Sequence, residues 1–519
     1  MSKNSIKRRK TFSLQKSFSP NNAAPFPLRL RYDAAQTTVE NIRHWSLADG
    51  LSADGSMSSE VRRTLRNRSR YEVANNAYAR GLVLTLAATC VGTGPRLQIL
   101  SDDDEFNKNV EMEFASWSES IRLFELLQTM RIAKITDGEA FAAILKNPKI
   151  KHPVEIDIRL IESDRVMSPY PTFDDKVDGI TYDKYGNPFR YYVSSEHPGD
   201  SSCFSVKFST IPADYMIHWY RVDRAGQSRG LPEIMPALPL FAQLRRYTLA
   251  VLAAAETAAD FAAVLYTDAP ANGEAQPLDP LDVISLEKRM ATVMPDGWKL
   301  GQIRAEHPNT TYAEFKREIL SEIGRCLQVP VNILLGDSSK HNYASGRLDH
   351  QTFFKSIKVE QTSCEQVVLN PIFDIWYRDA IRIGLFTPPT NSFLYEKSSV
   401  ELLKRKKYID NNTLHRCWFW DGMEHVDPFK EAKAASARVE SRISNLAIEC
   451  AKVGLDWEDV LVQAAREKNR MLELGLTINE VSPDEIEPEI EEDENEEVEI
   501  DESNARTASN KVYRRRDRR

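Results

Sequence analysis

The stretch TYAEFKREILSEIGRCLQVPVNILLGDSSKHNYASGRLDHQTFFKSIKVE, from Thr311 to Glu360, decides how this chain is organised. Thr311 followed by Glu314 has the spacing of a capping box, so a helix is expected to begin there. Pro330 disfavours helical backbone in the residue before it, so the helix is expected to end at Val329. Apolar residues recur every three to four positions and predict one buried face, formed by Tyr312, Phe315, Ile319, Ile323 and Leu327.

The second half of this stretch predicts a polar loop and a longer helix. Residues 336–345 contain glycine, aspartate, serine and asparagine, which favour loops, together with one lysine and one histidine. A helix is expected from about Ser345, with a kink at Pro371 because proline has no amide N–H to donate. The pattern is therefore helix, sharp break, polar loop and helix.

Outward from this stretch, the chain alternates between helical and mixed regions. The region 32–91 is predicted to be helical, with a break at Asn75 and Asn76. A long alanine-rich helix is expected over 231–266, followed by a proline-containing insert at 267–311 that returns the chain to an antiparallel partner helix. Between these regions, periodicity predicts helices at 104–117 and 124–135 and short strands at 141–145, 156–160, 179–182 and 189–193. Downstream, HRCWFWDG is expected to form a buried aromatic corner, and Asp427 and Asp456 are expected to cap helices closed by Gly454 and Gly475.

Composition excludes several classes of protein. A chain of 519 residues with 42% hydrophobic and 28% charged residues is expected to fold as two or more soluble globular domains. The most apolar run, 249–266, carries Glu256 and Asp260 and is a poor membrane span. The six cysteines form no CxxC pair, which argues against a structural zinc and for a reducing compartment.

Charge is strongly segregated along the chain, although the net charge is only −8. Residues 480–502 contain 14 acidic side chains and no lysine or arginine, and six bases lie within residues 1–19. Both ends are expected to be disordered, because such compositions bury too little apolar surface to fold. The remaining body is mildly acidic, which a high-affinity duplex-binding surface would not be.

Motifs for catalysis or for ligand binding are missing from the sequence. The segment GDSSK (336–340) lacks the spacing of a phosphate-binding loop, and GTGP at Gly92 lacks the third glycine of a dinucleotide loop. Neither an HExxH pair nor a GxSxG elbow occurs. We therefore expect no catalytic residue, no metal and no cofactor.

Four separated blocks together resemble the lambda-type portal proteins of tailed bacteriophages, the subunits of the head-tail connector. In chain order they are YEVANNAYARGLVLTLAATCVGTGPRLQ (71–98), HWYRVDRAGQSRGLPEIMPAL (218–238), QVPVNILLGD with NYASGR (328–347), and DPFKEAKAASARVESRI (427–443). The resemblance extends from about residue 30 to about residue 476. It implies an α+β portal fold with an α/β wing, a two-helix stem, a small clip insert, a long kinked spine helix and a helical crown.

The domain boundaries combine this resemblance with composition. The chain is expected to divide into a disordered basic arm (1–25), the wing (26–230), a stem helix (231–266), the clip (267–310), a second stem helix (311–330), a tunnel loop region (331–345), the spine helix (346–386), the crown (387–478) and a disordered acidic then basic tail (479–519).

The resemblance also implies a function. Family members form rings of twelve subunits at the portal vertex, through which double-stranded DNA is packaged and ejected. Implied partners are other copies of the chain, non-specifically bound DNA, the terminase large subunit, head-completion proteins, and major capsid and scaffold proteins, with no membrane. The implied location is the virion, and the host cytoplasm during assembly. Two other classes stay open: a nucleic-acid-processing enzyme, and a scaffolding or adaptor protein of the packaging apparatus.

Two groups of site residues follow. The resemblance places a DNA-contacting tunnel loop at Ser338, Ser339, Lys340, His341 and Asn342, where one lysine per subunit would form a ring of positive charge; the alternative is a plain helix connection. A subunit interface is expected at Arg62, Arg66, Arg245 and Arg246. For the arginines of 62–70, a solvated helix face is the alternative.

Overall fold

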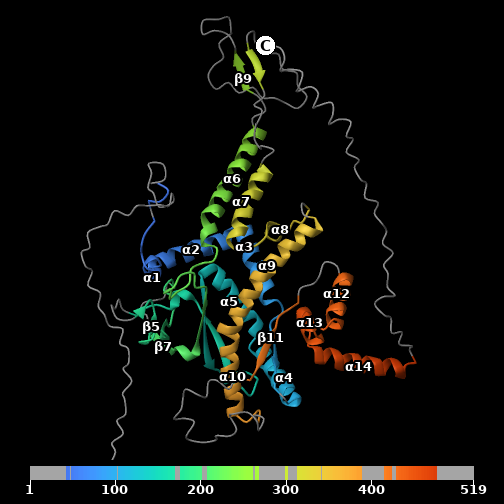
Figure 1. The fold of residues 1–519 in the computed structure, drawn as a ribbon. Helices are drawn as coiled ribbons and strands as arrows, with labels where there is room; N and C mark the ends of the chain where they lie inside the picture. Colours follow the sequence, from blue (N-terminus) through green and yellow to red (C-terminus); the bar gives the residue numbers. More distant parts are fainter. Residues whose placement is uncertain are drawn as a thin grey trace, which may run out of the picture.

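A computed structural model describes residues 43–475, apart from residues 47 and 102 and the segments 170–175, 201–206, 261–263, 268–297, 302–311, 340–341, 388–413 and 423–427. The predicted basic arm and acidic tail lie outside the described residues. The described chain mixes helices with small antiparallel sheets, so the α+β class is confirmed. Figure 1 shows a central body, a projecting pair of helices, and a group of helices at one flank.

The described chain begins with helices α1 (Ala53–Ser56), α2 (Ser59–Asn75) and α3 (Ala77–Val91). Asn76 separates α2 from α3, and its side chain accepts hydrogen bonds from the amides of Tyr78 (3.0 Å) and Ala79 (3.4 Å). The break predicted at these asparagines is therefore confirmed.

Two sheets build the mixed region. One has the strand order β3 (Ile156–Ile161), β2 (Glu139–Lys146), β8 (Met216–Tyr220), and the other has the order β4 (Lys176–Val177), β5 (Ile180–Tyr182), β6 (Pro188–Ser194), β7 (Phe208–Pro212). All of these strands pair antiparallel. The four strands predicted here are confirmed as β2, β3, β5 and β6, whereas the sequence did not predict β4, β7 and β8.

Strand β2 is buried on both faces because a different hydrophobic cluster packs against each of them. Ala142 and Ile144 belong to the cluster built on helices α4 (Asp104–Ser120) and α5 (Leu123–Asp137). Phe141 and Ala143, on the opposite face, pack with residues of the second sheet. One strand thus joins two hydrophobic cores.

A long helical segment completes the larger core. It runs through α9 (Tyr343–Cys364), a π-helical turn (Glu365–Leu369) and α10 (Asn370–Arg382). Phe373 and Trp376 of α10 are buried, with ring centroids 5.6 Å and 5.1 Å from that of Phe114 on α4. The π turn ends at Leu369, two residues before Pro371, and the chain continues through the proline as α10, so the kink expected at Pro371 stays a prediction.

Helices α6 (Leu238–Asp260) and α7 (Tyr312–Cys326) lie side by side and project from the body (Figure 1). They run antiparallel, since the Tyr312 hydroxyl donates to Thr248 Oγ1 (3.2 Å) while Cys326, at the other end of α7, lies 3.7 Å from the carbonyl of Glu233. Beyond them, β9 (Val264–Thr267) pairs antiparallel with β10 (Trp298–Gly301).

The predicted ends and faces of this helix pair need correction. Residues 231–237 and 264–267 are not part of α6, because prolines interrupt the first segment and the second forms β9. Helix α7 ends at Cys326 rather than Val329, since Gln328 has a φ of 58°. Its buried residues include Leu320 and Ile323, but Phe315 is half exposed.

The last part of the described chain returns to the body through β11 (Arg416–Phe419), which pairs with β1 (Arg96–Ile99). The buried aromatic corner predicted here is present at Trp418. Helices α12 (Pro428–Glu440), α13 (Leu446–Val453) and α14 (Trp457–Glu473) follow. The single helix predicted between Asp427 and Gly454 is wrong, because Arg442 has a φ of 58° and separates α12 from α13.

Candidate functional site

A tight turn joins α7 to α8 (Val331–Leu335) within the stretch from Thr311 to Glu360. The amide of Val329 donates to the Gly324 carbonyl over 2.9 Å. A Cβ at Gly324 would lie only 2.6 Å from the carbonyl oxygen of Val329, so a side chain there is excluded by backbone. Glycine at this position therefore allows the chain to fold back tightly onto the end of α7.

The following loop is held at both ends. Gly336, with a φ of 63°, ends α8, and the Asp337 amide donates to the carbonyl of buried Asn332 (3.1 Å). At the other end, the Asn342 side chain caps α9 by accepting from the amide of Ser345 (2.8 Å). The loop between α8 and α9 is thus short and anchored on two helices.

The predicted tunnel residues divide into three groups. Ser338 and Ser339 are exposed, and the Ser339 amide donates to Asp337 Oδ1 (2.9 Å). Asn342 is exposed as well, but its side chain serves as the helix cap. Lys340 and His341, which carry the predicted charge, lie outside the described residues.

The interface predicted at the arginines of α2 is not supported by their position. Arg62 and Arg66 are only 3% and 6% exposed, and both make ion pairs inside the chain. They form neither a solvated face nor a surface that a neighbouring subunit could reach. Arg245 on α6 is partly buried and lies over the ring of Tyr71, while Arg246 is exposed, so the interface stays a prediction for these two.

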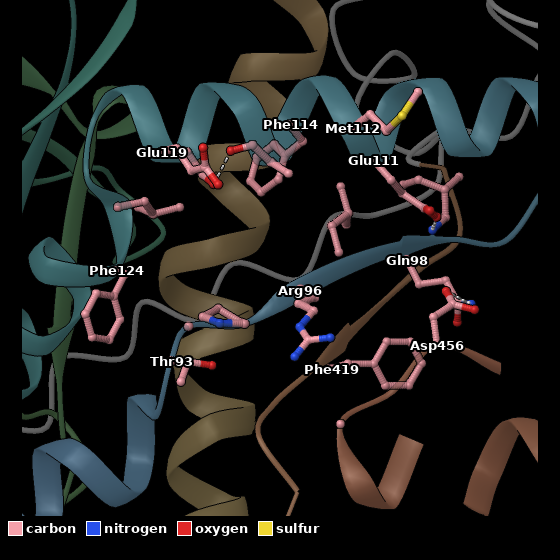
Figure 2. A pocket seen from close by; sticks show the side chains of 18 of the residues that line it. Thr93, Arg96, Gln98, Glu111, Met112, Phe114, Glu119, Phe124, Phe419 and Asp456 are labelled. Atoms are coloured by element: carbon pink, nitrogen blue, oxygen red, sulfur yellow. Dashed lines mark hydrogen bonds between the residues drawn. The ribbon is translucent and has the colours of Figure 1, made fainter. Parts of the chain in front are cut away.

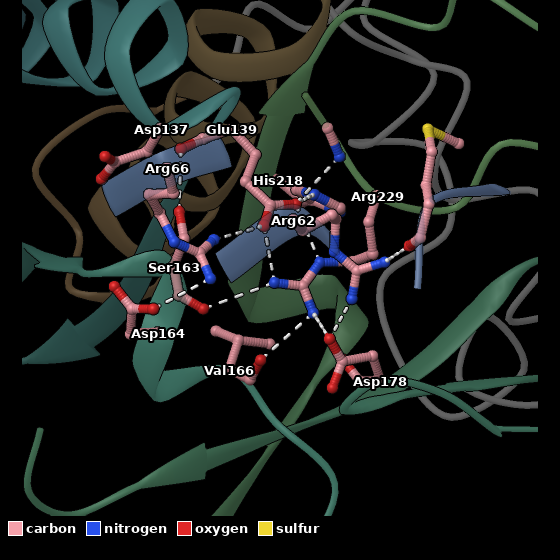
Figure 3. Close-up of polar contacts among 12 residues, drawn as sticks. Arg62, Arg66, Asp137, Glu139, Ser163, Asp164, Val166, Asp178, His218 and Arg229 are labelled. Carbon is pink, nitrogen blue, oxygen red and sulfur yellow. Dashed lines mark hydrogen bonds and ion pairs between the residues drawn. The ribbon is translucent and has the colours of Figure 1, made fainter. Parts of the chain in front are cut away.

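The arginines of α2 belong to a buried polar network centred on Glu139, the first residue of β2 (Figure 3). The Glu139 carboxylate is fully buried and accepts hydrogen bonds from Arg229 Nη2 (2.6 Å), Arg229 Nε (2.8 Å) and the amide of Gly230 (3.1 Å). His218 Nε2 lies 3.1 Å away and Arg66 Nη1 lies 3.6 Å away. Asp164 and Asp178 add negative charge to the network, through ion pairs with Arg66 and Arg62.

The network has clear electrostatic consequences. Burial alone raises the pKa of Glu139, but Arg229 and His218 outweigh it and hold this pKa well below its usual range. Burial lowers the pKa of His218, which is stacked between Phe141 and Tyr220, with ring centroids 4.2 Å from each. Glu139 is therefore ionised and His218 neutral at pH 7, so the histidine donates its Nε2–H to the carboxylate.

The same residues bring the backbone of the body against the base of the projecting helices. A Cβ at Gly138 would lie 2.2 Å from the carbonyl carbon of Leu231, and one at Gly230 would lie 2.1 Å from the Gly138 oxygen. The approach of these segments to one another requires glycine on both sides. The sequence analysis did not predict this network. The signal that could have indicated it is Glu139, a carboxylate at the start of the apolar strand β2.

A second buried charge cluster joins α5, the base of α6 and helix α9. Arg131 donates to both carboxylate oxygens of Glu233 at 3.0 Å, and Lys134 makes an ion pair with Glu360. Lys134 also lies 4.6 Å above the ring of Trp219. Both clusters therefore tie the projecting helices firmly to the sheet.

The described residues also bear on metal binding and on membrane insertion. Among the residues that the structure describes, no three His, Cys, Asp or Glu side chains are grouped so that they could hold a metal ion. None of the described helices is long and apolar enough to cross a membrane.

Comparison with known families explains this architecture. Residues 41–361 match the family model described as phage portal protein, lambda family. The chain belongs to this family. It is thus a portal protein, a structural component of a phage particle, as the four sequence blocks predicted.

Individual relatives are distant. A probable portal protein of Halomonas phage phiHAP-1 is 24% identical over 445 residues, which cover 80% of this chain and 81% of the relative. Among solved structures, a chain from the neck of an empty gene transfer agent particle, computed with C6 symmetry, is 13% identical, with a TM-score of 0.39 and coverage of 64% of this chain and 93% of that chain. A chain from the virion of a native gene transfer agent is 12% identical, with a TM-score of 0.38 and the same coverage.

Proposed function

We propose that this portal protein assembles into a closed ring, of twelve subunits as the family resemblance implies, around a channel for double-stranded DNA. The support comes from apolar side chains that a single subunit leaves exposed on the projecting helices. Leu249 and Leu252 on α6 and Phe315 on α7 are 58%, 54% and 50% exposed. Burying such a side chain fully contributes about 1.5–3 kcal/mol, so contact between neighbouring helix pairs would stabilise a ring substantially.

The observation that carries the channel proposal is the anchored loop between α8 and α9. Its ends are fixed by the bond from the Asp337 amide to Asn332 and by the Asn342 cap, so the described residues Ser338, Ser339 and Asn342 lie beside anchored helix ends. Ser338, Ser339 and Asn342 would face the DNA together with Lys340 and His341. A single base per subunit makes weak, salt-sensitive phosphate contacts, which hold DNA while still letting it move.

The remaining parts of the proposal concern partners and place. The β9–β10 end would meet the terminase large subunit and later the head-completion proteins. The body and crown would contact the major capsid and scaffold proteins. The subunit would assemble in the host cytoplasm and remain in the virion as a structural, non-enzymatic part, without a cofactor or a membrane.

Replacement of the two loop bases tests the channel proposal. The variant Lys340→Ala with His341→Ala should form rings in particle images, yet package less DNA or lose it sooner at low salt, with a smaller defect at high salt. The matched control is Lys184→Ala with Lys207→Ala, which removes two exposed bases beside β5, β6 and β7. If the loop variant packages and retains DNA like this control at low salt, the loop is a plain connection and the assignment of its residues is withdrawn.

A further inference from the structure

A groove of about 630 Å³ opens between the body and the flanking helices, outside both charge networks (Figure 2). Its walls come from β1, α4, the start of α5, β11 and the start of α14. In Figure 2, Met112 and Glu119 lie on α4 above the groove, with Arg96 on β1 and Asp456 across from them. A volume of this size accommodates several side chains of a bound segment.

The groove combines an apolar wall with an acidic rim. Met112 and Phe124 line it and are 55% and 37% exposed, so apolar surface is available to an occupant. Seven of the described lining residues are acidic and three are basic. Burial is the main cause that raises the pKa of Glu111 to about 7, and the carboxylates of Asp456, Glu458 and Asp459 add smaller contributions.

One segment of this chain has both the basic residues that the acidic rim would attract and the apolar side chains that the apolar wall would contact. Residues 1–31 contain eight lysines and arginines, no acidic residue, and the apolar side chains of Phe12, Phe18 and Phe26. The basic residues near the other terminus, 506–519, are a weaker match, because the same tail carries 14 acids at 480–502 that compete for them.

The position at which the described chain starts indicates which subunit's residues 1–31 would reach a given groove. The chain emerges beside α1 on one flank of the body, while α4, β11 and α13 lie on the other flank (Figure 1). In a head-to-tail ring, one flank of each subunit faces the opposite flank of the next. From residue 43, the twelve residues back to Arg31 span at most roughly 40 Å, which is enough to cross such an interface.

We propose that residues 1–31 of one subunit bind in the groove of the neighbouring subunit, with their bases at the acidic rim and their phenylalanines against Met112 and Phe124. This inference rests on the proposed ring. The arm then acts as a strap between subunits, and its charge makes the strap sensitive to salt.

Hydrogen exchange on full-length rings tests the strap. Residues 1–31 should exchange slowly in the parent and several-fold faster in Met112→Lys with Ala115→Lys, which adds two positive charges to the groove on exposed positions of α4. The matched control is Asn109→Lys with Ser116→Lys, which adds the same charge to exposed positions of α4 outside the groove and should protect the arm like the parent.

The possible results separate the inference from the function on which it rests. Equal exchange of residues 1–31 in the two variants, or fast exchange in parent rings, would refute the strap while leaving the ring intact. Groove-dependent protection of 506–519 instead would give the groove to the other terminus. Protection that persists in dilute single subunits would show an arm bound to its own chain. Particle images without rings would overturn the proposed function itself.

Discussion

Replacing Glu139 by glutamine should destabilise the body of the subunit strongly. The Glu139 carboxylate is fully buried and accepts from Arg229, His218 and the Gly230 amide, while Arg229 is itself only 1% exposed. Glutamine has nearly the same shape but carries no charge, and its NH₂ group cannot accept the hydrogen bonds that one carboxylate oxygen now accepts. Arg229 would then be a buried cation without its main counter-charge.

The size of the effect follows from this burial. Removing one partner of a buried ion pair costs about 3–5 kcal/mol, whereas exposed pairs contribute about 0–1 kcal/mol. Glu125→Gln is the matched control, because Glu125 pairs with Arg122 on the surface, where the two side chains are 50% and 73% exposed. The double variant Glu139→Gln with Arg229→Met should lose less stability than the two single losses combined, since neither residue then leaves an unpaired buried charge.

Hydrogen exchange of the β2 amides under increasing urea measures these differences locally, which avoids treating a chain of this size as two-state. Glu139→Gln should lower the urea concentration at which 139–146 opens, while Glu125→Gln should leave it nearly unchanged. If the two variants behaved alike, within about 0.5 kcal/mol, Glu139 would not be the counter-charge on which the network depends, and the reasoning would fail.

Two further predictions concern the backbone approach and the groove. Gly138→Ala should destabilise the subunit by several kcal/mol more than Gly186→Ala. Both glycines have a positive φ (92° and 85°), but only at Gly138 would the new methyl group collide with backbone atoms. The difference between the melting temperatures of the two variants therefore measures the effect of this collision. Glu111 has a folded pKa of about 7 against an ordinary 4.5, so the stability of the parent should fall as pH rises from 4.5 to 7 and then level off. Glu111→Gln removes the titrating group and should reduce this pH dependence of stability by on the order of 1 kcal/mol after solvent screening. The glutamine can still accept the hydrogen bond from the Ile99 amide, so the local structure is kept. A pH profile of thermal unfolding that is the same in the variant and the parent would contradict the assignment.

The sequence by itself determined the elements whose signals are local. The sequence pattern predicted helices α4 and α5, the alternation of apolar residues predicted β3 and β6, and Asn75 and Asn76 marked the break between α2 and α3. Four motif blocks in order were enough to identify the portal family, because a family pattern is a property of the sequence.

Only the tertiary structure decided which charges are buried and which apolar residues stay exposed. Arg66 looked like part of a solvated face because its own helix is polar, yet β2 and the loop before α6 bring Glu139 and Arg229 to it from 73 and 163 residues away. Phe315 shares the predicted apolar face of α7 with Ile323, but the body covers the helix only toward its C-terminal end. Periodicity reports which face of an element is apolar; what covers that face depends on contacts between distant segments, and these are set by the path of the whole chain.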